Sequence, residues 1–159
     1  MPVLFLLLLV SFPFLSKLDP KKENYKKFEQ TRELMQTVLL LFFAYAYFLS
    51  LYAIQFPDVN IGKFLLIGIG ILFAILGNYM GKIKQNYFIG IKVPWTLNDE
   101  DIWNKTSRFG GKAFVFGGIL FVVIGIFSRY ALRNVLSIIA GIVLLPILYS
   151  YLLFFKKKK

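Results

Sequence analysis

The chain has 159 residues, of which 58% are hydrophobic and 17% are charged, with a mean hydropathy of +0.67 and a formal net charge of +11. These values and the long apolar runs predict an integral membrane protein. The absence of cysteine and histidine from the sequence excludes disulfides, thiolate or imidazole metal sites and a histidine base. Because the basic residues lie between apolar runs, we attribute the positive charge to orientation in a membrane rather than to nucleic-acid binding.

The first apolar segment covers about residues 2–16. It is short for a span, since a helix rises about 1.5 Å per residue through a hydrocarbon core roughly 30 Å thick. A signal peptide is one alternative, but nothing basic precedes Lys17 and no good cleavage site follows the apolar run. A re-entrant segment broken at Pro13 is another. We favour a short span.

Longer apolar runs predict further spans at about residues 34–56, 64–81, 113–128 and 134–155. In 64–81, Gly70, Ala74 and Gly77 recur at helical spacing, which predicts a face that a neighbouring helix approaches closely. Pro146 should kink the last span, because proline removes one backbone donor. The sequence therefore predicts an all-α, polytopic transmembrane helix bundle of about five spans, forming one membrane domain over residues 1–159.

Basic residues predict how this bundle is oriented. The polar connection at 16–33, interpreted as a solvated loop that turns into a helix, holds six Lys or Arg residues; the connection at 82–112 holds six and the C-terminal tail four. The opposite connections hold Lys63, Arg129 and Arg133. Because basic residues are retained in the cytoplasm, we expect the N-terminus outside, the C-terminus inside and the connection at 82–112 in the cytoplasm.

The connection at 82–112 contains both tryptophans, Trp95 and Trp103, and three consecutive acidic residues at 99–101. Asn98 suits a helix N-cap, and the helix dipole favours negative charge in the first turn that follows. The pattern predicts one short amphipathic helix over about 99–109, lying in the membrane interface with the two tryptophans as anchors. Since this position explains the acidic residues without a ligand, we predict no metal site and no cofactor.

Three basic residues of this connection, Lys92, Lys105 and Arg108, have two interpretations. They could bind an anionic lipid or a partner, and general attraction to the inner leaflet explains them equally well. The residue pattern leaves these alternatives open.

The same connection carries a distinctive run at fixed spacing, which we take as the candidate partner-binding residues: Asn86, Gly90, Lys92, Pro94, Trp95, Thr96, Glu100, Trp103, Lys105, Thr106, Arg108 and Gly111. The run resembles the signature of the SdpI family of bacterial membrane proteins, N-x-x-x-G-I-R-T-P-W-T-L followed by an acidic residue, W-x-K-T-H-R and a glycine pair. The chain departs from it at Lys92, Val93 and Ser107, where the family has Arg, Thr and His. Lysine keeps the charge without the bidentate geometry, and serine cannot titrate as histidine does.

The resemblance implies a non-enzymatic protein that protects its producer against a secreted toxic peptide. In the best-known members it also implies a transcriptional repressor held at the membrane when toxin is bound. The resemblance also implies that full-length relatives carry one further N-terminal span. A chain that lacks this span could be a housekeeping relative with no toxin partner. The expected partners are the lipid bilayer, a peptide toxin and a cytoplasmic repressor, without direct nucleic-acid binding; the small-residue faces also allow a homo-oligomer.

The main alternative is a small membrane transporter or channel subunit, which the glycine-rich spans and the proline in the last span would suit. Against it, none of the expected spans contains Asp, Glu, Lys or Arg, the usual marks of ion-coupled transport. An enzyme would have only the acidic residues at 99–101 as candidates, and we therefore predict no enzymatic activity.

Overall fold

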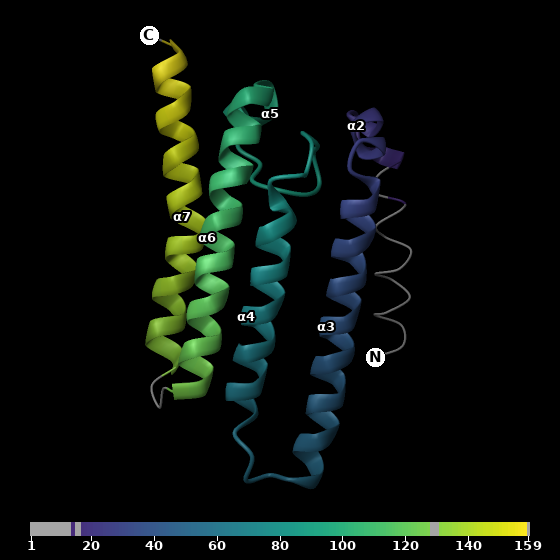
Figure 1. The fold of residues 1–159 in the computed structure, drawn as a ribbon, viewed down its shortest axis with the longest axis vertical. Helices are drawn as coiled ribbons and strands as arrows, with labels where there is room; N and C mark the ends of the chain where they lie inside the picture. Colours follow the sequence, from purple (N-terminus) through teal and green to yellow (C-terminus); the bar gives the residue numbers. More distant parts are fainter. Residues whose placement is uncertain (1–13, 15–16, 128–130, 159) are drawn as a thin grey trace.

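The computed structural model describes Phe14 and residues 17–127 and 131–158, so the expected span at 2–16 lies almost wholly outside it. Its helices are α2 (Lys22–Lys26), α3 (Glu29–Gln55), α4 (Ile61–Met80), α5 (Pro94–Asn98), α6 (Glu100–Phe127) and α7 (Ala131–Lys158) (Figure 1). In the described part of the chain, α3, α4, α6 and α7 are long and apolar enough to cross a membrane. The prediction of an all-α, multi-pass membrane protein is confirmed, whereas a fifth span is not.

The separate interfacial helix expected over 99–109 is not confirmed, because these residues form the beginning of α6, which continues through Gly110 and Gly111. Both glycines face close neighbours. A Cβ atom at Gly110 would lie 2.5 Å from Cδ1 of Ile91, and one at Gly111 would lie 2.5 Å from the carbonyl oxygen of Gly77. Tertiary contact therefore outweighs the cost of about 1 kcal/mol that glycine carries inside a helix.

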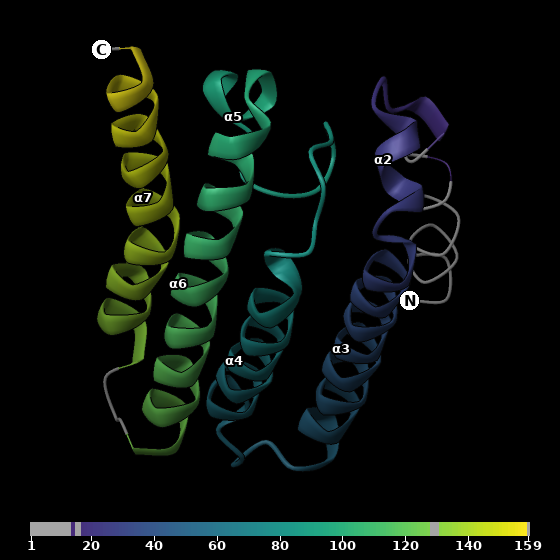
Figure 2. The same cartoon turned by 45° about the horizontal axis from the view of Figure 1, so that its top comes forward.

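The four long helices lie side by side in the order α3, α4, α6 and α7 (Figures 1 and 2). Backbones approach most closely along a line of glycines between α4 and α6, the glycine seam. A Cβ atom at Gly70 would lie 2.5 Å from the carbonyl oxygen of Gly118, and one at Gly77 would lie 2.6 Å from that of Gly111. Ala74 also faces Gly118. The close-approach face predicted for residues 64–81 is confirmed.

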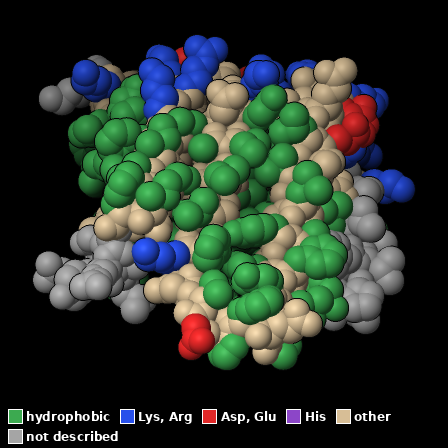
Figure 3. All heavy atoms as spheres, turned by 60° about the horizontal axis from the view of Figure 1, so that its bottom comes forward, with side chains coloured by type: hydrophobic (Ala, Val, Ile, Leu, Met, Phe, Trp, Pro, Cys, Tyr) green, Lys and Arg blue, Asp and Glu red, His purple; other side chains and the backbone are tan. Residues whose placement is uncertain are grey.

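The polar parts of the chain gather at one end of the bundle, the basic end. In Figure 1, α2, the loop between α4 and α6 and the end of α7 lie together at the top, and the short connection between α3 and α4 lies at the bottom. Most of the Lys and Arg side chains visible in Figure 3 lie along one edge, next to a surface of mainly apolar side chains. The bundle therefore has one strongly basic end and an apolar flank.

Candidate functional site

The loop that joins α4 to α6, residues 81–99, crosses the basic end and is called the signature loop below. Beneath it lies Trp103, whose side chain is 0% exposed and whose Nε1 donates a hydrogen bond to the carbonyl oxygen of Ile83 at 2.9 Å. Trp103 packs in one apolar cluster with Tyr25, Met35 and Met80. It thus fixes the loop from below and is not the interfacial anchor that we predicted.

Asn86 organises the first half of the signature loop, where its side chain is fully buried. Its Oδ1 accepts hydrogen bonds from the backbone N–H groups of Phe88 at 2.9 Å and Ile89 at 2.6 Å, and from the hydroxyl of Tyr25 at 3.2 Å. Its Nδ2 donates to the carbonyl oxygens of Lys84 at 2.8 Å and Ile89 at 2.9 Å. An amide carries both donors and acceptors, and it can therefore close a turn that lacks regular backbone pairing.

A buried carboxylate of the N-terminal connection holds the same part of the loop. Asp19 is 2% exposed, and its Oδ2 accepts hydrogen bonds from the hydroxyl of Tyr25 at 2.9 Å and the backbone N–H of Tyr87 at 2.8 Å. Burial and the neighbouring Asp19 carboxylate raise the pKa of the Tyr25 phenol, which keeps it a neutral donor. Asp19 was not among the predicted site residues, because residues 16–33 were expected to be solvated. Its place before Pro20, typical of a turn, was the available signal.

Hydrogen bonds to buried side chains also fix the second half of the loop. Gln85 accepts a hydrogen bond from the ammonium group of Lys21 and donates one from Nε2 to the carbonyl oxygen of Thr96 at 2.6 Å. Lys21 also donates to the carbonyl oxygen of Leu97 at 3.0 Å. Thr96 is fully buried, and its hydroxyl oxygen accepts the backbone N–H of Val93 at 3.1 Å. The residues that precede α3 are therefore part of the site.

Gly90 lies at the middle of the loop with a φ of +120°, and a Cβ atom there would lie 3.0 Å from the Trp103 ring. Both the backbone angle and the space favour glycine. A residue with a side chain would therefore be strained at this position of the signature loop.

Trp95 joins the signature loop to α7. Its Nε1 donates a hydrogen bond to Oγ of Ser150 at 2.8 Å, and its ring stacks on Phe154 with ring centres 5.8 Å apart. Ser150 is fully buried, and its hydroxyl in turn donates to the carbonyl oxygen of Ile147 at 2.7 Å. Pro94 begins the short helix α5 beside this contact. The loop is thus attached to the last helix as well as to the first connection.

Asp99 caps α6, one residue later than the predicted cap at Asn98, which ends α5. Its Oδ1 accepts the backbone N–H groups of Asp101 at 3.0 Å and Ile102 at 3.1 Å, and its Oδ2 pairs with the ammonium group of Lys157 at 2.5 Å. The hydrogen bond from Lys157, followed by those from the backbone, lowers the pKa of the Asp99 carboxyl.

The remaining signature residues divide between surface and interior. Lys92, Glu100, Lys105 and Arg108 are exposed, whereas Thr106 and Gly111 are buried within α6. Lys105 forms an ion pair with Asp101 at 2.8 Å. The exposed residues could reach a partner at the basic end, while the buried ones lie inside the bundle.

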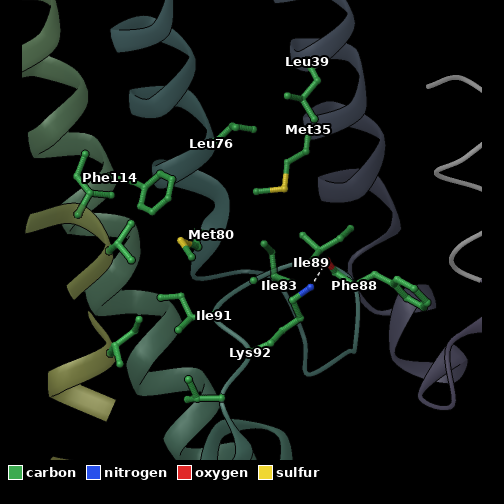
Figure 4. A pocket seen from close by; sticks show the side chains of 15 residues that line it. Met35, Leu39, Leu76, Met80, Ile83, Phe88, Ile89, Ile91, Lys92 and Phe114 are labelled. Atoms are coloured by element: carbon green, nitrogen blue, oxygen red, sulfur yellow. Dashed lines mark hydrogen bonds between the residues drawn. The ribbon is translucent and has the colours of Figure 1, made fainter. Parts of the chain in front are cut away.

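An apolar groove with a volume of about 500 Å³ lies under the signature loop and is called the loop groove below (Figure 4). Its walls come from all four long helices: Met35 and Leu39 of α3, Leu76 and Met80 of α4, Phe114 of α6, and Ile142, Val143 and Ile147 of α7. Ile83 and residues 88–93 of the loop close one end. The volume lies within the usual range of ligand sites, and the lining suits an apolar ligand.

The acidic residues of the site do not converge on one point. Asp99 faces Lys157 and Asp101 faces Lys105. Across the described ranges, no group of three or more acidic side chains is placed to hold a metal ion.

Comparison with known proteins connects this site to a family. Residues 82–153 match the model of the SdpI/YfhL protein family. Over 95 residues the chain is 36% identical to the Immunity protein SdpI of Bacillus subtilis (strain 168), in an alignment that covers 60% of this chain and 44% of that protein. No solved structure matches the chain. The matched residues include nearly all of the signature loop, α5, α6 and most of α7, and it is over this part that the chain is similar to the SdpI/YfhL protein family.

Proposed function

We propose that the chain is a non-enzymatic membrane protein that confers immunity to a secreted antimicrobial peptide. The observation that carries this proposal is that the family-matched residues 82–153 build the signature loop and supply the α6 and α7 walls of the groove beneath it. The similar protein of B. subtilis is named an immunity protein. A groove lined by apolar side chains suits an apolar segment of a membrane-active peptide.

The way in which the loop is attached supports a coupled mechanism. An apolar segment in the groove would contact residues 88–93, and this loop also lies at the basic end, beside α2 and the end of α7. We further propose that this end is cytoplasmic and holds a transcriptional repressor when the peptide is bound. In this mechanism the groove and the repressor surface are two sides of one loop.

Filling the loop groove should remove protection. In a susceptible strain that expresses the chain, Leu39→Trp adds bulk to the α3 wall, and overpacking a site costs about 1–3 kcal/mol. We therefore expect protection to fall about tenfold or more, measured as the peptide concentration that halves survival. The repressor that co-sediments with the membrane fraction should fall with it.

The matched control is Leu148→Trp, which adds the same bulk at a side chain that is 58% exposed on α7. It should leave protection unchanged when both variants are inserted in equal amounts. Equal protection by the two variants would exclude the loop groove as the peptide site, and no protection by the unsubstituted chain would refute the immunity function.

The proposed orientation can be tested with single cysteines, because the sequence contains none. Asn98 at the basic end and Asp58 between α3 and α4 are both exposed. On intact cells, a membrane-impermeant maleimide should label the Asp58→Cys variant and leave Asn98→Cys unlabelled until the cells are opened. The reverse pattern would place the signature loop outside the cell.

A further inference from the structure

A second groove, with a volume of about 530 Å³, lies along the α4–α6 pair and shares no lining residue with the loop groove. Its α4 side is formed by Gly77, Asn78 and Gly81, and its α6 side by Arg108, Gly111, Lys112, Val115, Phe116 and Ile119. The glycines leave part of the floor without side chains. A long, thin ligand could therefore lie close to the two backbones.

Positive charge gathers at the upper end of this groove. Arg108 and Lys112 are exposed one helical turn apart, and within the described residues neither forms an ion pair or a hydrogen bond. The stem of Arg108 lies over Gly81, where an added Cβ atom would be 3.2 Å from Cγ of Arg108. Two adjacent cations without a carboxylate partner form a site of the kind that binds an anionic head group between helices.

The lower part of the groove is apolar and belongs to the membrane-spanning part of α6. Phe116 is 66% exposed and Ile119 is 52% exposed, and both follow Lys112 at spacings of about one and two turns. A free inorganic anion would make no use of these side chains. A ligand with a charged head and a hydrocarbon chain would contact both parts.

We propose that this groove binds one anionic phospholipid of the membrane leaflet at the basic end. Its phosphate lies between Arg108 and Lys112, Asn78 offers an additional donor, and an acyl chain runs along Phe116 and Ile119. Guanidinium and ammonium groups both form charge-assisted hydrogen bonds to phosphate oxygens. In this proposal Arg108 binds a specific anionic lipid, and its positive charge does more than attract the protein to the inner leaflet in general.

The test uses the full chain, purified in a zwitterionic detergent and titrated with phosphatidylglycerol while native mass spectrometry counts bound lipid. The double variant Arg108→Gln/Lys112→Gln should bind about 25-fold more weakly, because each basic residue at an anionic lipid surface contributes about a factor of five. Phosphatidylcholine should bind weakly and equally to both proteins. The charge-keeping variant Arg108→Lys/Lys112→Arg should retain phosphatidylglycerol, which separates loss of the site from loss of the fold.

The matched control is Lys22→Gln/Lys26→Gln, which removes two exposed positive charges from α2 at the same end of the bundle. It should bind phosphatidylglycerol as the unsubstituted chain does. Equal weakening of both double variants would show general attraction to charge, and no weakening of either would show that the lipid binds elsewhere; both results overturn the proposal. Displacement of the lipid by excess glycerol phosphate would also overturn it, because the site would then bind the free anion.

Discussion

Replacing Gly77 with alanine should destabilise the bundle by about 1–3 kcal/mol, the usual cost of overpacking a close contact. The added Cβ atom would lie 2.6 Å from the carbonyl oxygen of Gly111 and 2.7 Å from Cβ of Phe114. Backbone atoms cannot rotate away as side-chain ends can, and α4 and α6 must therefore move apart along the glycine seam. Gly77→Leu should prevent the close pairing altogether. Helical circular dichroism during unfolding in a denaturing detergent measures both effects.

The control for this substitution is Gly141→Ala in α7, where an added Cβ atom would meet nothing within 4 Å. This variant should be neutral or slightly more stable, since alanine is favoured over glycine in a helix by about 1 kcal/mol. If the two alanine variants unfold alike, the glycine seam is not what holds α4 to α6.

Replacing Asn86 with alanine should release the first half of the signature loop while the long helices stay folded. The backbone N–H groups of Phe88 and Ile89 and the carbonyl oxygen of Lys84 would lose their partner, and each buried unpaired group costs about 1–3 kcal/mol. We expect the amides of the loop to exchange with solvent much faster, and trypsin to cleave after Lys92. Hydrogen exchange followed by mass spectrometry measures the first effect, and a gel measures the second.

Asn98→Ala is the matched control, because Asn98 is exposed and its side chain forms no hydrogen bond to any residue that the structure describes. Its loop amides should exchange at the rate of the unsubstituted chain. Unchanged exchange in the Asn86→Ala protein would contradict the organising role assigned to this side chain.

The four long apolar helices were predictable because long apolar runs have few other stable states in a membrane. The close face of α4 was predictable for a related reason, since Gly70, Ala74 and Gly77 recur at the period of a helix.

The errors arose where contacts distant in sequence outweighed local preference. Gly110 and Gly111 are poor helix residues locally, yet α6 runs through them because Gly77 and Ile91 pack against their bare backbone. Trp103 has the appearance of an interfacial anchor in sequence, but its partner Ile83 lies twenty residues earlier. Asp19 meets Tyr87 across an even longer separation. The loop groove itself could not be predicted, since its lining comes from four helices and a loop.

The signature loop is fastened at both edges of the row of helices. On one side Asp19 and Asn24, which precede α3, hold Tyr87 and Gln85; on the other side Trp95 is bound to Ser150 of α7. The loop thus links α3 to α7, and its length limits the distance between these two outer helices. Inserting residues between these two attachment points would widen the loop groove, and deleting residues would narrow it. A change in loop length would therefore change which ligands fit the groove, even with every lining side chain unchanged.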